Sequence, residues 1–215
     1  MIIIGVTGNS GAGKSTVSTI IKNNTGAFVV DADQILKTMR QPGEDYFNEI
    51  VNIFGEEILY TKSKKKGKID LAKFSNILFS NREKRDKLNK ITFKYVNKKV
   101  KPLLVENKNK DFIILDFPLL YEGGYDKICN YVIGVISDNE TKLSRIKERD
   151  RINKEQVQAR IDTQINDEEL KEKADFIINN SKDIKYINLV KEVIKVIHKI
   201  KKNEEEKKKN ESIGF

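Results

Sequence analysis

The 215-residue sequence predicts an α/β fold in which helices flank a parallel β-sheet. Two observations predict this fold. Short apolar runs rich in isoleucine and valine recur without apolar–polar alternation, which is typical of parallel strands buried on both faces. Charged stretches with apolar residues at helical spacing separate these runs, and strands that alternate with helices form parallel sheets through right-handed crossovers.

Five apolar runs predict a sheet of five strands. They are "MIIIGV" (1–6), "GAFVVDAD" (26–33), "DFIILDFPLL" (111–120), "YVIGVIS" (131–137) and "ADFIINN" (174–180). We expect Pro118 to end the third strand, because proline cannot donate a hydrogen bond to a neighbouring strand.

The segments between the strands predict helices. One helix follows the first strand to about Asn24, a second covers 140–165, and an amphipathic helix covers 184–200. The charged residues 201–215 predict a fraying extension of that last helix.

The segment between the second and third strands is mostly helical over 34–107, interrupted by the polar stretch "YTKSKKKGK" (60–68). It is too long for a simple crossover. We therefore expect an inserted helical subdomain at the carboxyl edge of the sheet, where ligands bind in folds of this class.

The composition excludes several classes of protein. A hydrophobic fraction of 38% with 34% charged residues is typical of a soluble globular chain and not of a disordered one. No apolar run approaches the roughly 20 residues of a membrane span, and no basic region precedes a long apolar stretch, so we expect neither a membrane segment nor a secretory signal. The single cysteine, Cys129, excludes an internal disulfide framework and favours a cytoplasmic location.

The formal net charge of +9 allows two interpretations. A basic surface can bind nucleic acid, or it can attract a small polyanion such as a nucleotide. The chain has no tryptophan, and its basic runs carry no interleaved aromatic residues on which bases could stack. We therefore expect no nucleic acid among the partners.

The stretch "GNSGAGKS" (8–15) matches the phosphate-loop pattern G-x-x-x-x-G-K-[ST] without a mismatch. Glycines allow a turn that aims backbone N–H groups at phosphate oxygens, and the helix that follows adds partial positive charge. The lysine supplies a point charge near the β- and γ-phosphates. The predicted nucleotide-binding residues are Gly8, Gly11, Ala12, Gly13, Lys14, Ser15 and Thr16.

Two residues predict a magnesium site. Ser15 offers a hydroxyl oxygen to Mg²⁺, a cation that prefers oxygen ligands. Asp116 ends the apolar run "FIILD" (112–116), which is the position of the acid that holds Mg²⁺ in phosphate-loop enzymes. A charged residue at the end of a buried strand also needs a partner. We expect both residues to contact the metal.

Asp31 and Asp33 close the predicted second strand, and two interpretations stay open for them. In a kinase, a carboxylate orients the acceptor hydroxyl and takes its proton during phosphoryl transfer. An aspartate after a strand also commonly caps the next helix.

These motifs together resemble the dephospho-CoA kinase family. The resemblance covers the chain to about Ile200 and rests on "GVTGNSGAGKST" (5–16), "DADQI" (31–35), "QPGEDYFNEIVNIFG" (41–55), "LDFPLLYE" (115–122), "RIKERD" (145–150), "ARIDTQ" (159–164) and "ADFIINNS" (174–181). It implies transfer of the ATP γ-phosphate to the ribose 3′-hydroxyl of dephospho-CoA, the last step of coenzyme A synthesis. A kinase of another nucleoside or nucleotide stays open, as does a basic phosphate-loop ATPase that handles nucleic acid.

The resemblance also implies which residues contact the acceptor. Asp33 would be the general base. Pro118, Leu119 and Leu120 would lie beside the acceptor, with Glu122 nearby.

The charged helix after the fourth strand would be a lid over the phosphates. Its cations Arg145 and Arg149 would neutralise charge that develops during transfer, together with Lys14 of the loop. Arg160 and Gln164 form a second pair four residues apart in the same lid.

Two departures from the family pattern affect the insertion. The family usually carries a His-Pro pair where this chain has Phe93 and Lys94, and an Asp-Arg pair where it has Asp70 and Leu71. We expect this chain to make the corresponding contacts differently.

The predicted organisation has four parts. A phosphate-loop NTPase core comprises 1–31, 108–139 and 172–200, a helical acceptor subdomain covers 32–107, a helical lid covers 140–171, and a charged tail covers 201–215. The expected partners are ATP, Mg²⁺ and dephospho-CoA. His198 and Cys129 lie away from catalytic partners in the sequence, and we expect both to be packing or surface residues.

Overall fold

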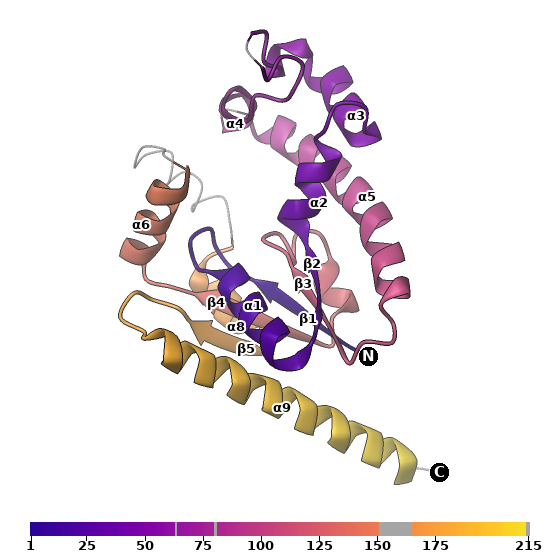
Figure 1. The fold of residues 1–215 in the computed structure, drawn as a ribbon, viewed down its shortest axis with the longest axis vertical. Coiled ribbons are helices and arrows are strands. Elements are labelled where there is room, and N and C mark those ends of the chain that lie inside the picture. Colours follow the sequence, from indigo (N-terminus) through magenta and orange to yellow (C-terminus); the bar gives the residue numbers. More distant parts are fainter. Residues whose placement is uncertain (63, 80, 151–164, 214–215) are drawn as a thin grey trace. The chain divides into compact units, whose positions relative to one another are not determined.

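The computed structural model describes residues 1–62, 64–79, 81–150 and 165–213 (Figure 1). Its sheet has five strands in the order β2-β3-β1-β4-β5. The strands are β1 (Ile2–Thr7), β2 (Phe28–Asp31), β3 (Phe112–Asp116), β4 (Tyr131–Ile136) and β5 (Phe176–Asn179). β1 pairs in parallel with β3 and with β4, and β4 pairs in parallel with β5. The predicted parallel sheet is confirmed.

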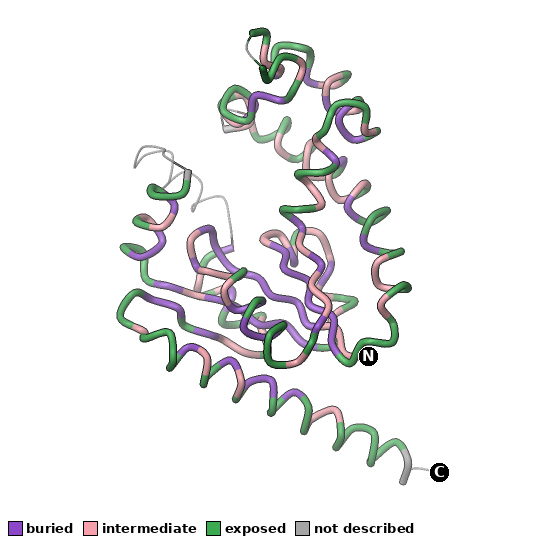
Figure 2. The backbone as a smooth tube through the Cα atoms, in the orientation of Figure 1, coloured by how far each residue is buried: buried purple, intermediate pink, exposed green. Residues whose placement is uncertain are grey.

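The chain divides into two compact units, and the first comprises residues 1–30 and 107–215. Its described helices are α1 (Lys14–Thr25), η2 (Tyr125–Ile128), α6 (Asn139–Asp150), α8 (Asp167–Lys173) and α9 (Tyr186–Ile213). α1 and α9 pack on one face of the sheet, where apolar side chains of both helices and of β1, β3 and β4 form a common core. Figure 2 shows the buried positions following these strands.

The second unit, residues 31–106, is helical and has apolar packing of its own. It comprises α2 (Ala32–Met39), α3 (Asp45–Phe54), η1 (Glu56–Ile58), α4 (Leu71–Phe79) and α5 (Arg82–Glu106). The rings of Phe54 and Phe74 pack edge to face with their centroids 5.0 Å apart. The basic stretch predicted as a loop is closed by a bridge between Leu59 and Ile69.

Three elements end at positions that differ from the sequence expectations. β2 stops at Asp31, so Asp33 lies in the first turn of α2 and not on a strand. β3 stops at Asp116, before Pro118, and the chain then turns. α9 continues to Ile213, so the tail is a regular helix and not a fraying extension.

The helix predicted over 140–165 is only partly described. α6 accounts for its first half, and residues 151–164 lie outside the described residues. Among the helices that the structure does describe, none is both long and apolar enough to cross a bilayer.

Candidate active site

The phosphate loop connects β1 to α1, and its glycines have backbone angles that other residues rarely adopt. Gly8, Gly11 and Gly13 have φ angles of 147°, 80° and 90°. Gly13 is the N-cap of α1, and no side chain makes a capping hydrogen bond there. The first N–H groups of a helix lack partners within the helix, so this end of α1 is suited to bind phosphate oxygens.

Lys14 curls back over the loop. Its Nζ donates to the carbonyl oxygen of Gly8 at 2.9 Å and to that of Asn9 at 3.4 Å. The ammonium is therefore held at the mouth of the turn, next to the N-terminus of α1. This is the position from which a lysine can contact the β- and γ-phosphates of a nucleotide.

Two side chains from later in the sequence contact the carbonyl oxygens of the loop. Arg145 of α6 donates from Nη1 to Gly11 at 3.1 Å and to Ala12 at 3.4 Å. Asn180, just after β5, donates from Nδ2 to Ala12 at 2.9 Å. A Cβ on Gly13 would collide with this Asn180 amide nitrogen. These bonds satisfy the carbonyl oxygens of Gly11 and Ala12 and hold this part of the loop in place.

Asn180 contacts the phosphate loop, and sequence reasoning did not single it out. It belongs to the motif "ADFIINNS", but nothing in that motif alone points to a contact with the loop. Arg145 was expected in a lid over the phosphates, and its contact with the loop puts it beside the donor site. Arg149 lies one turn further along α6 and is exposed.

Asp116 lies at the carboxyl end of β3, beside the strand that leads into the loop. It is 7% exposed and stands opposite Val6 in the β1–β3 register. The next residue, Phe117, donates its N–H to the Val6 carbonyl oxygen at 3.1 Å. The other candidate metal ligand, Ser15, lies exposed in the first turn of α1. Both candidate ligands therefore belong to the first unit.

Asp31 and Asp33 have different roles in the structure. The Oδ1 atom of Asp31 accepts hydrogen bonds from the N–H groups of Asp33 at 2.8 Å and Gln34 at 3.1 Å, so Asp31 caps α2. The Asp33 side chain is exposed. The capping interpretation therefore applies to Asp31, and the carboxylate of Asp33 is accessible for chemistry.

The residues predicted beside the acceptor lie in the turn after β3. Pro118 and Leu119 are half-buried, and the Pro118 carbonyl oxygen accepts from Thr7 Oγ1 at 3.4 Å. Leu120 is 0% exposed, and its Cδ1 lies 2.7 Å from where a Cβ on Gly5 would be. Its side chain packs in the core against β1, whereas Pro118 and Leu119 are partly accessible.

Glu122 lies on an open hollow of about 620 Å³. The hollow is also lined by Tyr121, Gly123, Gly124, Asp126, Lys127 and Lys173. Partial burial raises the pKa of the Glu122 carboxyl, and the negative charge of Glu169 raises it further. The surroundings are thus suited to a polar ligand, with one cation, Lys173, close to the acid.

The comparisons with known proteins identify the family. A sequence model described as "Dephospho-CoA kinase" matches residues 2–186. The chain belongs to the dephospho-CoA kinase family. It is 42% identical to a dephospho-CoA kinase of Fusobacterium nucleatum, over 86% of this chain and 92% of that protein. It is 37% identical to a dephospho-CoA kinase of Listeria monocytogenes, over 93% of this chain and 98% of that protein.

Solved structures agree with the assignment to the dephospho-CoA kinase family. The fold matches a dephospho-CoA kinase from Campylobacter jejuni with a TM-score of 0.61 and 32% sequence identity. The alignment covers 94% of this chain and 98% of that one. The predicted phosphate-loop kinase fold is confirmed.

The two segments in which this dephospho-CoA kinase family member departs from the usual pattern differ in their contacts. Lys94 Nζ lies 2.8 Å from Glu49 Oε2, which also accepts from the Tyr95 hydroxyl at 2.7 Å. Asp70 accepts from the N–H groups of Ala72 and Lys73 and so caps α4. Phe93 is half-buried and Leu71 is exposed. The predicted lid pair Arg160 and Gln164 lies outside the described residues.

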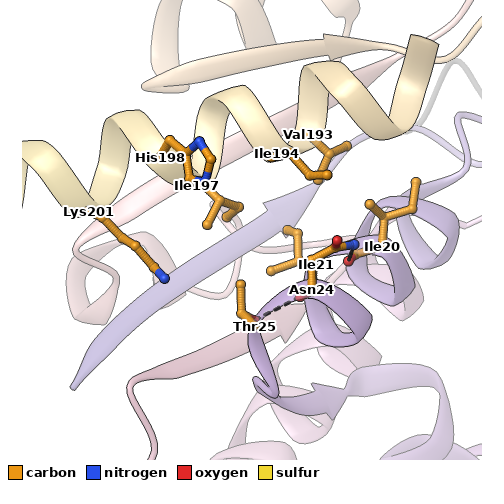
Figure 3. A pocket seen from close by; sticks show the side chains of 9 residues that line it. All are labelled: Ile20, Ile21, Asn24, Thr25, Val193, Ile194, Ile197, His198 and Lys201. Carbon is orange, nitrogen blue, oxygen red and sulfur yellow. Dashed lines mark hydrogen bonds between the residues drawn. The ribbon is translucent and has the colours of Figure 1, made fainter. Parts of the chain in front are cut away.

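A second cavity, of about 100 Å³, lies between α1 and α9 (Figure 3). Of its polar lining residues, Asn24 and Thr25 donate to carbonyl oxygens of their own helix. His198 lines it from α9 and is exposed.

The single cysteine lies away from this cavity. Burial raises the pKa of Cys129 to about 12, and its Sγ donates to the Tyr125 carbonyl oxygen. His198 is thus a surface residue and Cys129 a partly buried one, within the expectation of packing or surface roles.

Proposed function

We propose that this protein transfers the γ-phosphate of ATP to the 3′-hydroxyl of the ribose of dephospho-CoA, giving coenzyme A and ADP. The observation that carries the proposal is the phosphate loop. Its glycines have positive φ angles, it leads into an uncapped helix N-terminus, and it lies in a chain matched by the dephospho-CoA kinase family over residues 2–186. The loop supports ATP as the phosphate donor. Family membership supports dephospho-CoA as the acceptor.

On the donor side, the loop amides and Lys14 hold the β- and γ-phosphates of ATP. The N-terminus of α1 faces the same oxygens and adds its partial positive charge. Arg145 and Arg149 supply cations that neutralise the charge spread over the transferred group. Electrostatic stabilisation of this kind is the main contribution that a protein makes to phosphoryl transfer.

The Ser15 hydroxyl and the Asp116 carboxylate fit a Mg²⁺ ion, because both are oxygen ligands and both lie at the carboxyl edge of the sheet. When bound, Mg²⁺ neutralises charge on the phosphates and holds them in line for transfer. Among the described residues, no cluster of three or more acids, histidines or cysteines forms a metal cage.

On the acceptor side, Asp33 is the general base. The bond between the γ-phosphorus and the ADP oxygen breaks as the 3′-oxygen attacks, and the hydroxyl proton passes to the Asp33 carboxylate. Its exposed side chain and its position two residues after β2 support this role. Pro118, Leu119 and Glu122 contact the acceptor. We also propose a cytoplasmic location, where the lone cysteine stays reduced.

One experiment separates the proposal from its rivals. ADP release is measured with dephospho-CoA, with nucleosides and with nucleoside monophosphates as acceptors, at equal ATP and magnesium concentrations. We expect turnover with dephospho-CoA alone, and identification of the product as coenzyme A completes the result. Faster turnover with a nucleoside or nucleoside monophosphate would replace the proposed acceptor.

A further inference from the structure

Lys142 of α6 is a charged side chain in an unusual environment. It is 2% exposed, although a buried ammonium is costly unless it is paired. Its Nζ lies 2.6 Å from Oδ2 of Asp167, the first residue of α8. Lys142 and Asp167 therefore join the two helices that precede and follow residues 151–164.

The second oxygen of the same carboxylate contacts the phosphate loop. Asp167 Oδ1 accepts from Asn9 Nδ2 at 3.2 Å. Asn9 is also 2% exposed, and its own Oδ1 accepts no hydrogen bond from the described residues. Within the described residues, Asp167 is thus the polar anchor of the Asn9 side chain.

The backbone of Asn9 in turn orders the rest of the loop. Its carbonyl oxygen accepts from the Ala12 N–H at 3.1 Å and from Lys14 Nζ at 3.4 Å. The orientation of Asn9 therefore affects both the tight turn and the lysine that faces the phosphates. A chain of contacts runs from Lys142 through Asp167 and Asn9 to Lys14.

The backbone at Lys142 touches the loop at a second point. A Cβ on Gly11 would lie 2.7 Å from the Lys142 carbonyl oxygen and 2.9 Å from its Cα. Arg145, three residues further along α6, donates to the Gly11 carbonyl oxygen. α6 therefore contacts the loop along one face, and the ion pair of the buried Lys142 with the partly exposed Asp167 fixes that face relative to α8.

We propose that Lys142 and Asp167 are positioning residues for phosphate binding, which hold Asn9 and, through it, the loop in the shape that accepts the donor nucleotide. Neither residue needs to touch ATP. The loop forms before the nucleotide binds, so that binding does not have to order it. This positioning role depends on one part of the proposed function, namely that the loop binds a nucleoside di- or triphosphate.

The test measures the dissociation constant of ADP by calorimetry, which needs no acceptor and no turnover. Asn9→Ala removes only the bond to Asp167 and leaves the ion pair intact. We expect it to weaken ADP binding about tenfold, which is typical of losing a hydrogen bond to a charged group. The KM for dephospho-CoA is expected to stay within about twofold, because the change is confined to the donor site.

Two double variants separate positioning from a purely structural role. Lys142→Met with Asp167→Leu replaces the pair by apolar side chains, a change that buried ion pairs often tolerate. Lys142→Met with Asp167→Asn is neutral as well but keeps an oxygen for Asn9. We expect the variant with Asp167→Leu to bind ADP about tenfold more weakly than the parent, and the variant with Asp167→Asn to stay within about threefold of the parent. Both variants should have similar unfolding temperatures. Lys202→Met with Glu206→Leu, an exposed pair on α9, is the matched control and leaves ADP affinity unchanged.

Combining Asn9→Ala with the apolar pair gives the decisive comparison. If the Lys142–Asp167 pair acts through Asn9, the triple variant binds ADP no more weakly than Asn9→Ala alone. The loss of ADP affinity caused by the apolar pair then already includes the loss caused by removing the Asn9 side chain. Full addition of the two losses, or an Asn9→Ala variant with ADP affinity within about twofold of the parent, overturns the proposal. A parent enzyme that binds ADP but does not phosphorylate dephospho-CoA would refute the proposed acceptor and leave this inference standing.

Discussion

Gly8 lies where β1 enters the phosphate loop, and two separate constraints act on it. Its φ angle is 147°, and a Cβ there would collide with the carbonyl oxygen of Val135 on β4. Because Val135 belongs to a central strand, its backbone cannot move without disturbing the sheet. Glycine is thus required at this position by space as well as by conformation.

We predict that Gly8→Ala lowers the free energy of unfolding by about 3 kcal/mol or more and abolishes detectable ADP binding at micromolar concentrations. Gly26→Ala is the matched control. Gly26 has a φ of 70°, and no atom lies within 4 Å of the place that an added methyl group would take, so only backbone strain of about 1 kcal/mol is expected. Chemical denaturation of both variants measures the difference, and equal losses would contradict the role of Val135.

The exposed carboxylate of Asp33 leads to a second prediction at the residue scale. We predict that Asp33→Asn lowers kcat for dephospho-CoA by about a hundredfold or more while ADP affinity stays within about threefold, because a base acts on the acceptor and not on the donor. Asp31→Ala is a useful comparison, since it removes the neighbouring cap of α2 and should mainly reduce stability. Near-normal turnover by Asp33→Asn would remove Asp33 from the role of base.

Residues of the candidate site differ in how readily the sequence reveals them. Lys14, Ser15 and Asp116 follow from local patterns, a glycine-rich turn and an acid after an apolar run. Asn180 and Asp167 could not be found in this way, because their contacts with the loop join positions more than 150 residues apart. The burial of Leu120 could not be predicted either, because a leucine in a motif can pack against a ligand or in the core.

At the scale of single elements, α6 begins with a charged cap. Asp138 precedes the helix, and its carboxylate accepts from the Thr141 N–H at 2.7 Å and from the Thr141 hydroxyl at 2.6 Å. These hydrogen bonds lower the pKa of Asp138 from 3.8 to about 2. An acid with a lowered pKa stabilises the folded state while it is ionised. Its contribution is therefore complete above pH 3.8 and is lost as the pH falls towards 2.

We predict that Asp138→Ala lowers the unfolding temperature by a few degrees at neutral pH and that the difference from the parent shrinks between about pH 4 and pH 2. Asp138→Asn keeps an oxygen for the Thr141 N–H but carries no charge, so its loss relative to the parent should be smaller at neutral pH and should shrink over the same range, as the parent carboxylate becomes protonated. Calorimetry across the pH series gives both values. A difference for Asp138→Ala that stays constant down to pH 2 would show that the charge of the cap has no effect.

The ends of elements were predicted less well than their existence, for physical reasons that differ between cases. α2 begins as soon as β2 ends because Asp31 caps it, and no break in the apolar pattern signals that change. α9 was expected to fray after residue 200, where its apolar repeat stops. The tail is held instead by a polar contact, since Glu204 accepts from the Tyr131 hydroxyl at 2.9 Å and from Lys207 at 2.9 Å.

At the scale of the whole molecule, length alone predicted the inserted helical unit, because a segment of that size between two strands cannot be a simple crossover. Its internal packing was not predictable, since contacts such as Tyr46 with Thr92 and Lys94 with Glu49 join helices far apart in sequence. Lys94 is one of the residues at which the chain departs from the family's usual pattern, and its ion pair with Glu49 is a contact within the insertion.

The net charge of +9 concerns the whole molecule, and it attracts polyanions of every kind. Both proposed substrates are anionic, so we predict that raising the ionic strength from about 20 to about 200 mM lowers kcat/KM for dephospho-CoA several-fold and changes kcat by less than about twofold. Double-stranded DNA should compete only at the lower salt, because non-specific contacts to its phosphates are screened at the higher one. Steady-state assays at both salt concentrations, with and without DNA, measure these effects. Inhibition by DNA that persists at the higher salt would mean that the basic surface binds nucleic acid specifically, and the second interpretation of the charge would then apply.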